Sequence, residues 1–185
     1  INVIQKKQKI GIVKRQDTLE SQANYAYLAI GSNLGKKIYN LLCTKYKLST
    51  NGVRIVKSSS FYSTKSWPNP KFPNYINAVL YVKTNLSLPC LFKEIKLIEK
   101  SLGRVNAPKN HPRMCDIDII DFNGKFYNLQ NIDLKVPHPR MDTRSFVLLP
   151  LFEINKTWKH PKTKKNIVNL ISNMKSDDIR SIKLI

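Results

Sequence analysis

Two aspartates that lie two positions apart, Asp116 and Asp118, are the residues in this sequence best suited to chemistry. They fall in an apolar run that predicts a β-strand, in which residues two apart point to the same face. Adjacent carboxylates repel each other and are costly to desolvate unless a cation neutralises them. Mg²⁺ suits such a pair, because it binds one or two carboxylates and completes its shell with water and phosphate oxygens. The alternative is a polar face at a solvent-exposed edge, since D-x-D alone is a weak motif.

Basic side chains gather just before this pair. Arg104 and Arg113 bracket a loop that also carries Lys109, and Arg113 lies three residues before Asp116. Arginine binds phosphate through paired hydrogen bonds, and a cation that bridges phosphate oxygens is the usual electrostatic device of phosphoryl transfer. Acids for a metal beside bases for phosphates predict a Mg-nucleotide site. The sequence has no GxxxxGK[ST] motif, so side chains would hold the nucleotide in place of a glycine-rich loop.

His138 lies between two prolines in the string VPHPRM, and Arg144 follows six residues later. Because proline fixes the backbone, this loop would hold the imidazole in one direction. A single histidine is more often structural than catalytic, so both interpretations stay open for His138.

The elements that must position these residues follow from hydrophobic periodicity. Aromatic and aliphatic runs predict strands over residues 25–30, 53–62, 75–82 and 115–120. Helical spacing predicts helices over residues 34–48, 90–102, 144–154 and 167–174. A turn at Asn123-Gly124 predicts that residues 125–128 pair back on the last strand. The order strand, helix, strand, strand, helix, strand is that of a ferredoxin-like fold, which hosts many functions.

Composition bounds the class of protein. With 185 residues, 42% of them hydrophobic, the chain suits one compact domain and is too short for two ordinary ones. We assign residues 25–185 to that domain and residues 1–24 to an N-terminal extension or linker. No run of about 18 uncharged apolar residues is present, which excludes a membrane-spanning helix. The three cysteines are widely spaced with no CxxC pair, which argues against a disulfide framework or zinc site and predicts a reducing, cytoplasmic setting.

The net charge of +20 comes from 32 basic and 12 acidic residues. The lysine excess is spread along the chain and identifies no particular partner, because a diffuse positive charge attracts polyanions in general. Nucleic acid, anionic small molecules and a lysine bias across a whole proteome would all account for it. Four of the seven arginines and five of the twelve acidic residues crowd into residues 104–144, where we therefore expect the chemistry.

Several strings in register resemble the 6-hydroxymethyl-7,8-dihydropterin pyrophosphokinase family of folate biosynthesis. The resemblance covers about residues 25–154. Its landmarks are AIGSNLG at 29–35, SSFYST at 59–64, PNYINA at 73–78, IE at 98–99 with GR at 103–104, PRMCDIDI at 112–119, VPHPRM at 136–141 and RSF at 144–146.

The resemblance implies transfer of pyrophosphate from ATP to the hydroxymethyl group of a reduced pterin, with release of AMP. It implies an α+β, ferredoxin-like βαββαβ core with a mainly antiparallel sheet between helices, in three layers. The catalytic residues it implies are Arg104, Arg113, Asp116 and Asp118, the two aspartates holding two Mg²⁺ ions. The ATP-binding residues it implies are Glu99, Lys109, Arg113, Ile119, His138 and Arg144. The pterin-binding residues it implies are Thr64, Tyr75, Asn77 and Phe146.

The physical chemistry of the implied pterin residues agrees with these roles. A flat heteroaromatic ring favours stacking on aromatic faces, although core packing would also explain Tyr75 and Phe146. An amide that both donates and accepts suits the mixed polar edge of a pterin, and Asn77 lies in an apolar strand where an unpaired amide would cost about 1–3 kcal/mol.

The loop of residues 104–113 departs from the family pattern. It is one residue shorter than usual, Asn106 stands where an arginine is common, and residues 109–111 replace a segment that often contains tryptophan. Lysine lacks the forked geometry of arginine, so we expect fewer or rearranged ATP contacts from this loop. We also expect the loop to close during the cycle, because the transfer step must exclude water.

Two alternatives come from the same observations. A basic ferredoxin-like domain could be an RNA-binding module, but the sequence lacks the aromatic RNP string and places two aspartates on the corresponding strand. The chain could also be the pterin pyrophosphokinase unit of a multifunctional folate enzyme, with a fused or neighbouring folate-pathway domain as its partner.

Overall fold

The computed structural model of the chain describes residues 23–66, 69–104 and 111–185. Its strands are β1 (Asn24–Ser32), β2 (Val53–Ser58), β3 (Tyr62–Thr64), β4 (Tyr75–Thr84), β5 (Asp116–Phe122), β6 (Tyr127–Leu129), β7 (Leu134–Val136) and β8 (Lys183–Leu184). Its α-helices are α1 (Lys37–Thr50), α2 (Leu88–Ser101), α3 (Ser145–Ile154), α4 (Ile167–Ser172) and α5 (Ser176–Arg180). Within this part of the chain, no helix is long and apolar enough to cross a membrane.

In the main sheet, β1 lies between β5, which forms one edge, and β4. β2 and β3 pair with successive parts of the outer edge of β4, and β8 adds outside β3. Every pair is antiparallel, which is the arrangement of a ferredoxin-like βαββαβ core. The predicted α+β fold is therefore confirmed.

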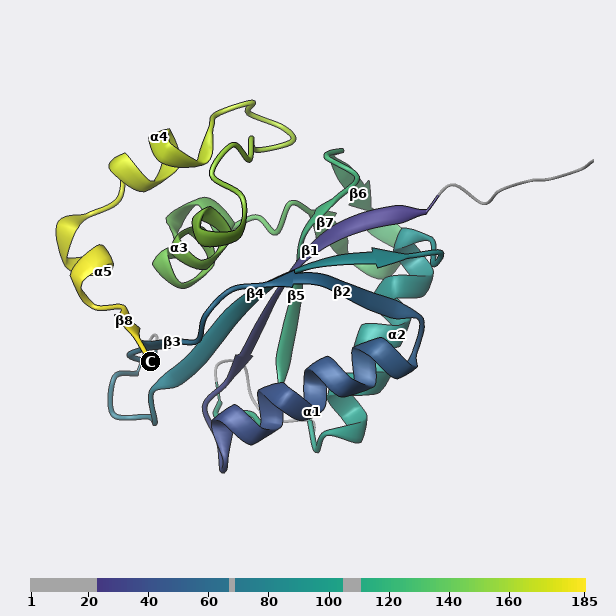
Figure 1. The fold of residues 1–185 in the computed structure, drawn as a ribbon, viewed down its shortest axis with the longest axis horizontal. Coiled ribbons are helices and arrows are strands. Elements are labelled where there is room, and N and C mark those ends of the chain that lie inside the picture. Colours follow the sequence, from purple (N-terminus) through teal and green to yellow (C-terminus); the bar gives the residue numbers. More distant parts are fainter. Residues whose placement is uncertain (1–22, 67–68, 105–110) are drawn as a thin grey trace, which may run out of the picture.

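Helices cover both faces of this sheet (Figure 1). α1 and α2 lie on one face, where Leu28, Leu80 and Leu91 belong to the larger of two cores. α3 packs on the opposite face, where Val79, Ile120 and Leu148 belong to the second core. Two cores on two sides of one sheet make the three layers that the resemblance implied.

The outer edge of β4 differs from the expected single strand over 53–62. The ladder is interrupted at Ser59, whose backbone N–H donates to the Val79 carbonyl while its Oγ accepts from the Val79 N–H at 2.9 Å. Because this side chain takes the place of a backbone partner, β2 ends at Ser58 and β3 begins at Tyr62. The outcome is a bent edge that carries β3 toward the end of the sheet where the aspartates lie.

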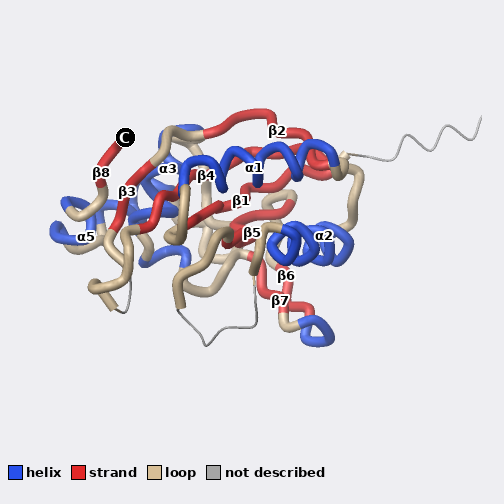
Figure 2. Tube along the Cα trace, turned by 90° about the horizontal axis from the view of Figure 1, so that it is seen from below, coloured by secondary structure: helices blue, strands red, loops and turns tan. Residues whose placement is uncertain are grey.

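The predicted return of residues 125–128 onto the last strand is mostly wrong. The turn forms as expected, with Asn123 and Gly124 at φ of 55° and 64°, and one bridge joins Phe122 to Lys125. β6 then pairs with β7 in a separate two-stranded ribbon, which projects from the main sheet (Figure 2). The ribbon covers the edge of the larger core, to which Leu134 and Val136 contribute.

Candidate functional site

The two aspartates project from β5 toward the face of the sheet that α3 only partly covers. Between and beside them, Cys115, Ile117 and Ile119 are buried in the opposite core, so the expected alternation of faces is confirmed. A bulge opposite Tyr27 and Leu28 of β1 then turns both Ile120 and Asp121 toward the α3 side. Asp116 and Asp118 keep about 30% of their side-chain surface exposed, which leaves them open to a ligand.

Two guanidinium groups converge on Asp116. Nη1 of Arg104 lies 2.9 Å and Nη1 of Arg113 lies 3.0 Å from the same oxygen, Oδ1. Burial lowers the pKa of Arg113, but the neighbouring Asp116 carboxylate outweighs it, so the pKa of Arg113 is raised above its usual value. Arg113 therefore stays charged at any physiological pH, and it lies with Arg104 at the point where the sequence predicts phosphate binding.

Glu99 lies beneath this pair and is completely buried. Its Oε1 accepts a hydrogen bond of 2.8 Å from the Ile117 backbone N–H and contacts Arg104. Its Oε2 accepts from Lys96 at 2.9 Å. Glu99 thus ties α2 to β5 and orients Arg104, and its side chain does not line the cavity described below.

Asp118 is flanked from the other side by the segment before α3. Nη1 of Arg144 donates to its Oδ2 at 3.1 Å, and Nε2 of His138 lies 4.0 Å from the same oxygen. Burial lowers the pKa of His138, although Asp118 opposes this shift. Nδ1 of His138 accepts from the Arg140 backbone N–H at 3.1 Å, so the neutral ring carries its proton on Nε2, toward Asp118.

The neighbouring strands supply a polar and aromatic wall. Gly31 of β1 lies between Asn77 of β4 and Asp116 of β5 in the ladder. A Cβ at Gly31 would lie 2.9 Å from Oδ1 of Asn77, so only glycine lets the amide approach so closely. Nδ2 of Asn77 donates to Oγ1 of Thr64 at 3.0 Å, and the half-buried Tyr75 lies two residues before Asn77 on the same strand. Burial raises the pKa of Tyr75, so its hydroxyl stays protonated at neutral pH.

These groups line one cavity of about 700 Å³. Ten of the thirteen residues predicted for the site line it: Thr64, Tyr75, Asn77, Arg104, Arg113, Asp116, Asp118, His138, Arg144 and Phe146. Arg144 also lies over the Phe146 ring, with its guanidinium carbon 5.4 Å from the ring centroid. The cavity is thus acidic and basic at one end and aromatic and polar at the other.

Three predicted residues lie elsewhere. Glu99 is buried below Arg104, and the Ile119 side chain packs in the core on the opposite side of β5, because odd and even residues of a strand face opposite ways. Lys109 lies outside the described residues. The roles that the resemblance implied for these three stay predictions.

The cavity also has lining residues that the sequence reading missed. Lys96 comes from α2, Ser66 follows β3, and Asp178 comes from α5 near the chain end. Lys96 lies three residues before Glu99 on α2, at helical spacing, which is a signal that could have found it. No sequence pattern predicts that Ser66 or Asp178 lines the cavity. Their positions depend on the pairing of β3 with the bent edge of β4 and with the C-terminal strand β8.

The donor set fits a hard divalent cation. In the described part of the chain, arginine side chains donate hydrogen bonds to Oδ1 of Asp116 and to Oδ2 of Asp118. The two carboxylates lie two residues apart on one face of β5. Mg²⁺ needs only one or two carboxylates when substrate phosphates and water supply its other ligands. Among the described residues, no group of three or more histidine, cysteine or acidic side chains is placed to hold a metal ion, so these residues by themselves offer no complete cage.

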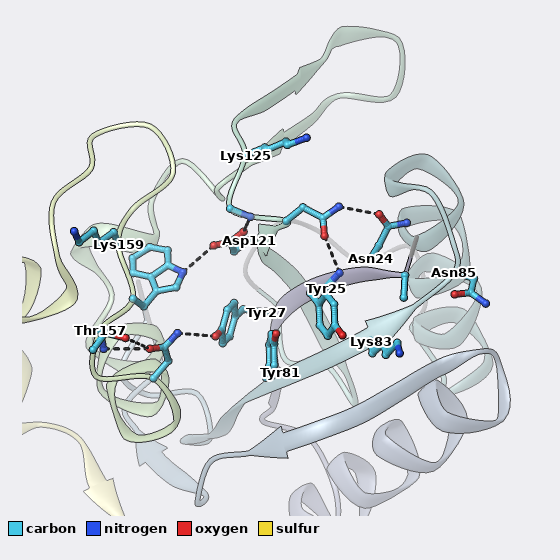
Figure 3. Close-up of a pocket in the computed structure, with 15 residues that line it drawn as sticks. Asn24, Tyr25, Tyr27, Tyr81, Lys83, Asn85, Asp121, Lys125, Thr157 and Lys159 are labelled. Carbon is cyan, nitrogen blue, oxygen red and sulfur yellow. Dashed lines mark hydrogen bonds between the residues drawn. The ribbon is translucent and has the colours of Figure 1, made fainter. Parts of the chain in front are cut away.

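A larger hollow of about 1610 Å³ lies at the far end of the same sheet face (Figure 3). Tyr81 stacks there on Tyr27 and on Tyr25, with ring centroids 4.8 Å and 5.6 Å apart. The carboxylate that lines it, Asp121, already accepts hydrogen bonds from Trp158 and from the Gly124 N–H. The pairing of exposed carboxylates with several guanidinium groups is therefore a property of the smaller cavity.

Comparison with known proteins agrees with this geometry. A model of the 7,8-dihydro-6-hydroxymethylpterin-pyrophosphokinase (HPPK) family matches residues 27–156. The 2-amino-4-hydroxy-6-hydroxymethyldihydropteridine pyrophosphokinase of Synechocystis is 34% identical over 151 residues, which cover 81% of this chain and 76% of that protein. The folic acid synthesis protein fol1 of Pneumocystis carinii is 35% identical over 170 residues, 92% of this chain.

A solved structure of a Plasmodium falciparum HPPK-DHPS triple mutant has the same fold, with a TM-score of 0.68 at 19% identity. It aligns with 91% of this chain and 48% of that chain, and this chain spans only 22% of the fol1 protein. The three cysteines of this chain are free, as its sequence predicts. Since the family model covers well over half of the sequence and the fold and cavity agree with it, this chain belongs to the 7,8-dihydro-6-hydroxymethylpterin-pyrophosphokinase (HPPK) family.

Proposed function

We propose that this chain transfers pyrophosphate from ATP to the hydroxymethyl group of 6-hydroxymethyl-7,8-dihydropterin, releasing AMP, as a step of folate biosynthesis. The observation that carries the proposal is the single cavity in which Asp116 and Asp118, each bonded to arginine, face Asn77 and Tyr75. One end suits a polyphosphate and the other a flat polar ring. In this reaction the hydroxymethyl oxygen attacks the β-phosphorus and its proton passes to water. The bond from that phosphorus to the oxygen it shares with the α-phosphate breaks, and AMP leaves with the electron pair.

The basic groups around the aspartates would hold the triphosphate. Arg104 and Arg113 reach Asp116 from one side and Arg144 reaches Asp118 from the other, so the three can exchange carboxylate contacts for phosphate oxygens. The Nε2–H group of His138 would donate a hydrogen bond to a phosphate oxygen. Fixed positive charges and donors of this kind stabilise the charge that spreads over the transferred group.

Asp116 and Asp118 would hold two Mg²⁺ ions together with the phosphates. Bound there, the ions would neutralise phosphate charge and align the β-phosphorus with the attacking oxygen. The aspartates lie on a strand that is buried on its other face, so their positions are fixed before any ligand arrives. Glu99 would act as a positioning residue, since it holds Arg104 from below.

The pterin would occupy the other end of the cavity. Asn77 already donates to Thr64, which leaves its Oδ1 beside Gly31 to accept from the amino-pyrimidine edge. Tyr75 and Phe146 would stack on the ring. The proximity of this end to the aspartates would bring the hydroxymethyl group to the β-phosphate, which is the main contribution that positioning makes to a two-substrate reaction.

The test is the identity of the nucleotide product. ATP and Mg²⁺ are incubated with the chain, with and without 6-hydroxymethyl-7,8-dihydropterin, and the products are separated by chromatography. AMP that depends on the pterin, with a pyrophosphorylated pterin in equal amount, is the expected result. ADP as the product would mean single phosphoryl transfer, and no turnover by the folded protein would contradict the proposal.

We also propose that the chain works as one unit of a multifunctional folate enzyme in the cytoplasm. The support is that it spans 22% of the fol1 protein and about half of the fused HPPK-DHPS chains. Three free cysteines fit a reducing compartment. Mass measurement of the protein in extracts of its source would find a chain much longer than 185 residues, whereas a product of that length would contradict the fusion.

A further inference from the structure

Ser66 is an unusual residue in the wall of the active-site cavity. It lies two positions beyond Thr64 of β3, lines the cavity, and is 4% exposed. Among the described residues, its Oγ is the one buried side-chain nitrogen or oxygen for which no hydrogen-bond partner is found. A buried hydroxyl without a partner destabilises the folded state, because it has lost its bonds to water.

Three other buried hydroxyls along the outer edge of β4 have partners. Oγ of Ser59 donates to the Ser60 carbonyl and accepts from the Val79 N–H. Oγ1 of Thr64 accepts from Asn77, and Oγ1 of Thr84 donates to the Gly52 carbonyl. The chain therefore satisfies this type of group elsewhere on the same sheet edge, and the exception falls at the position that lines the cavity.

The neighbours of Ser66 define which ligand group it would meet. Thr64 accepts from Asn77 and keeps its own proton to donate, while Asn77 keeps Oδ1 to accept. Thr64 and Asn77 are the residues that the proposed function assigns to the polar edge of the pterin. A serine hydroxyl turns between three staggered positions, and since Oγ of Ser66 has no bond to break, it can turn into the cavity at little cost.

We propose that Ser66 is a specificity-determining residue whose hydroxyl binds the polar edge of the pterin beside Thr64 and Asn77. The proposal rests on the proposed function. The amino-oxo-pyrimidine edge of a pterin carries donors and acceptors side by side, and a hydroxyl can serve either. A ligand that supplies the missing partner gains the hydrogen bond and relieves the unsatisfied group, so binding of the pterin is favoured over that of a ring without this edge.

The test compares Ser66→Ala with the wild type by calorimetric titration. Titrations use 6-hydroxymethyl-7,8-dihydropterin in the presence of Mg²⁺ and an ATP analogue with a methylene group between the α- and β-phosphates. We expect Ser66→Ala to raise the dissociation constant of the pterin about tenfold, the effect of one hydrogen bond. The dissociation constant of the ATP analogue stays unchanged, and the melting temperature of the free protein stays equal or rises, because an unsatisfied hydroxyl has been removed.

Ser63→Ala is the matched control, since Ser63 lies on β3 outside the cavity lining, and it should change none of the three quantities. Unchanged pterin affinity in Ser66→Ala would overturn the inference. So would a lower melting temperature with unchanged pterin affinity, or equal losses for both ligands, because either would mean a structural role. If the wild type releases AMP and Ser66→Ala binds the pterin normally, this inference fails and the proposed function stands. If the wild type shows no turnover, the proposed function itself fails.

Discussion

Replacing Glu99 with glutamine tests whether this residue positions the site from within the protein. The amide keeps an acceptor for the Ile117 N–H but loses the negative charge that binds Arg104 and Lys96. Exchange of a charged for a neutral acceptor costs about 1 kcal/mol, the difference between typical bonds of the two kinds. The two ion pairs involve partly exposed partners, with 33% and 45% of their side chains accessible, so we allow only about 0.5 kcal/mol for each.

The expected loss is therefore about 2 kcal/mol of the free energy of unfolding. For a chain of this size it corresponds to a fall of roughly 4–8 °C in melting temperature. Glu99→Ala would cost about 1–3 kcal/mol more than Glu99→Gln, because it also leaves the buried Ile117 N–H without its acceptor. Thermal and urea unfolding followed by circular dichroism measure both variants.

Glu94→Gln is the matched control, because Glu94 is a partly exposed glutamate on the same helix. Its melting temperature should stay within about 1 °C of the wild type, as is usual for substitutions near the surface. Loss of the Arg104 support should also lower kcat of Glu99→Gln, with a smaller change in KM for ATP. A variant with wild-type stability and a raised KM for ATP alone would refute the positioning role and favour direct contact of Glu99 with the nucleotide.

Four further predictions concern other parts of the molecule. Asp118→Asn should lower Mg²⁺-dependent turnover at least about a hundredfold with the fold intact by circular dichroism, and full activity would break the metal assignment. Asn77→Leu should weaken pterin binding about tenfold or more in calorimetry and leave ATP binding nearly unchanged, whereas equal losses would count against its role. Burial raises the pKa of Cys115 to about 12, so iodoacetamide at pH 8 should alkylate the exposed Cys90 and spare Cys115 in the native protein, as mass spectrometry would record. Burial also raises the pKa of Asp121 above its usual 3.8, so the folded state keeps this proton to a higher pH than the unfolded state does. The free energy of unfolding of the wild type, relative to that of Asp121→Asn, should therefore fall as pH rises from about 4 through the raised pKa. Urea unfolding at a series of pH values measures this difference, and a constant difference would refute the shift.

The family and the fold class were readable in the sequence because their signals are local. Alternating apolar residues predicted β1, β4 and β5 nearly to their ends, since successive residues of a strand must face opposite sides. The same rule placed the side chains of Asp116 and Asp118 together. Helical spacing did the same for α1, α2 and α3.

The errors came where distant segments compete for one backbone. The predicted strand over 53–62 is interrupted because the Ser59 side chain replaces a backbone partner in the ladder. β6 does not pair with β5, because β6 pairs with β7 instead. The side chain of Ile119 faces the core on the other side of β5, and the nucleotide role that the resemblance implied for this residue stays a prediction. Helix α5 and strand β8 carry too few residues for periodicity to reveal them.

Which chemical groups are present, and in what order they lie along each strand and helix, could be read from the sequence, since this depends on neighbours a few residues apart. Three features instead depend on contacts between distant segments: Gly31 lies between Asn77 and Asp116, Glu99 supports Arg104 from below, and Ser66 lines the cavity without a partner. Each of these depends on which strands pair and in which register. That choice is made by the burial of two cores on opposite faces of one sheet, a free-energy balance over the whole chain that no local window contains.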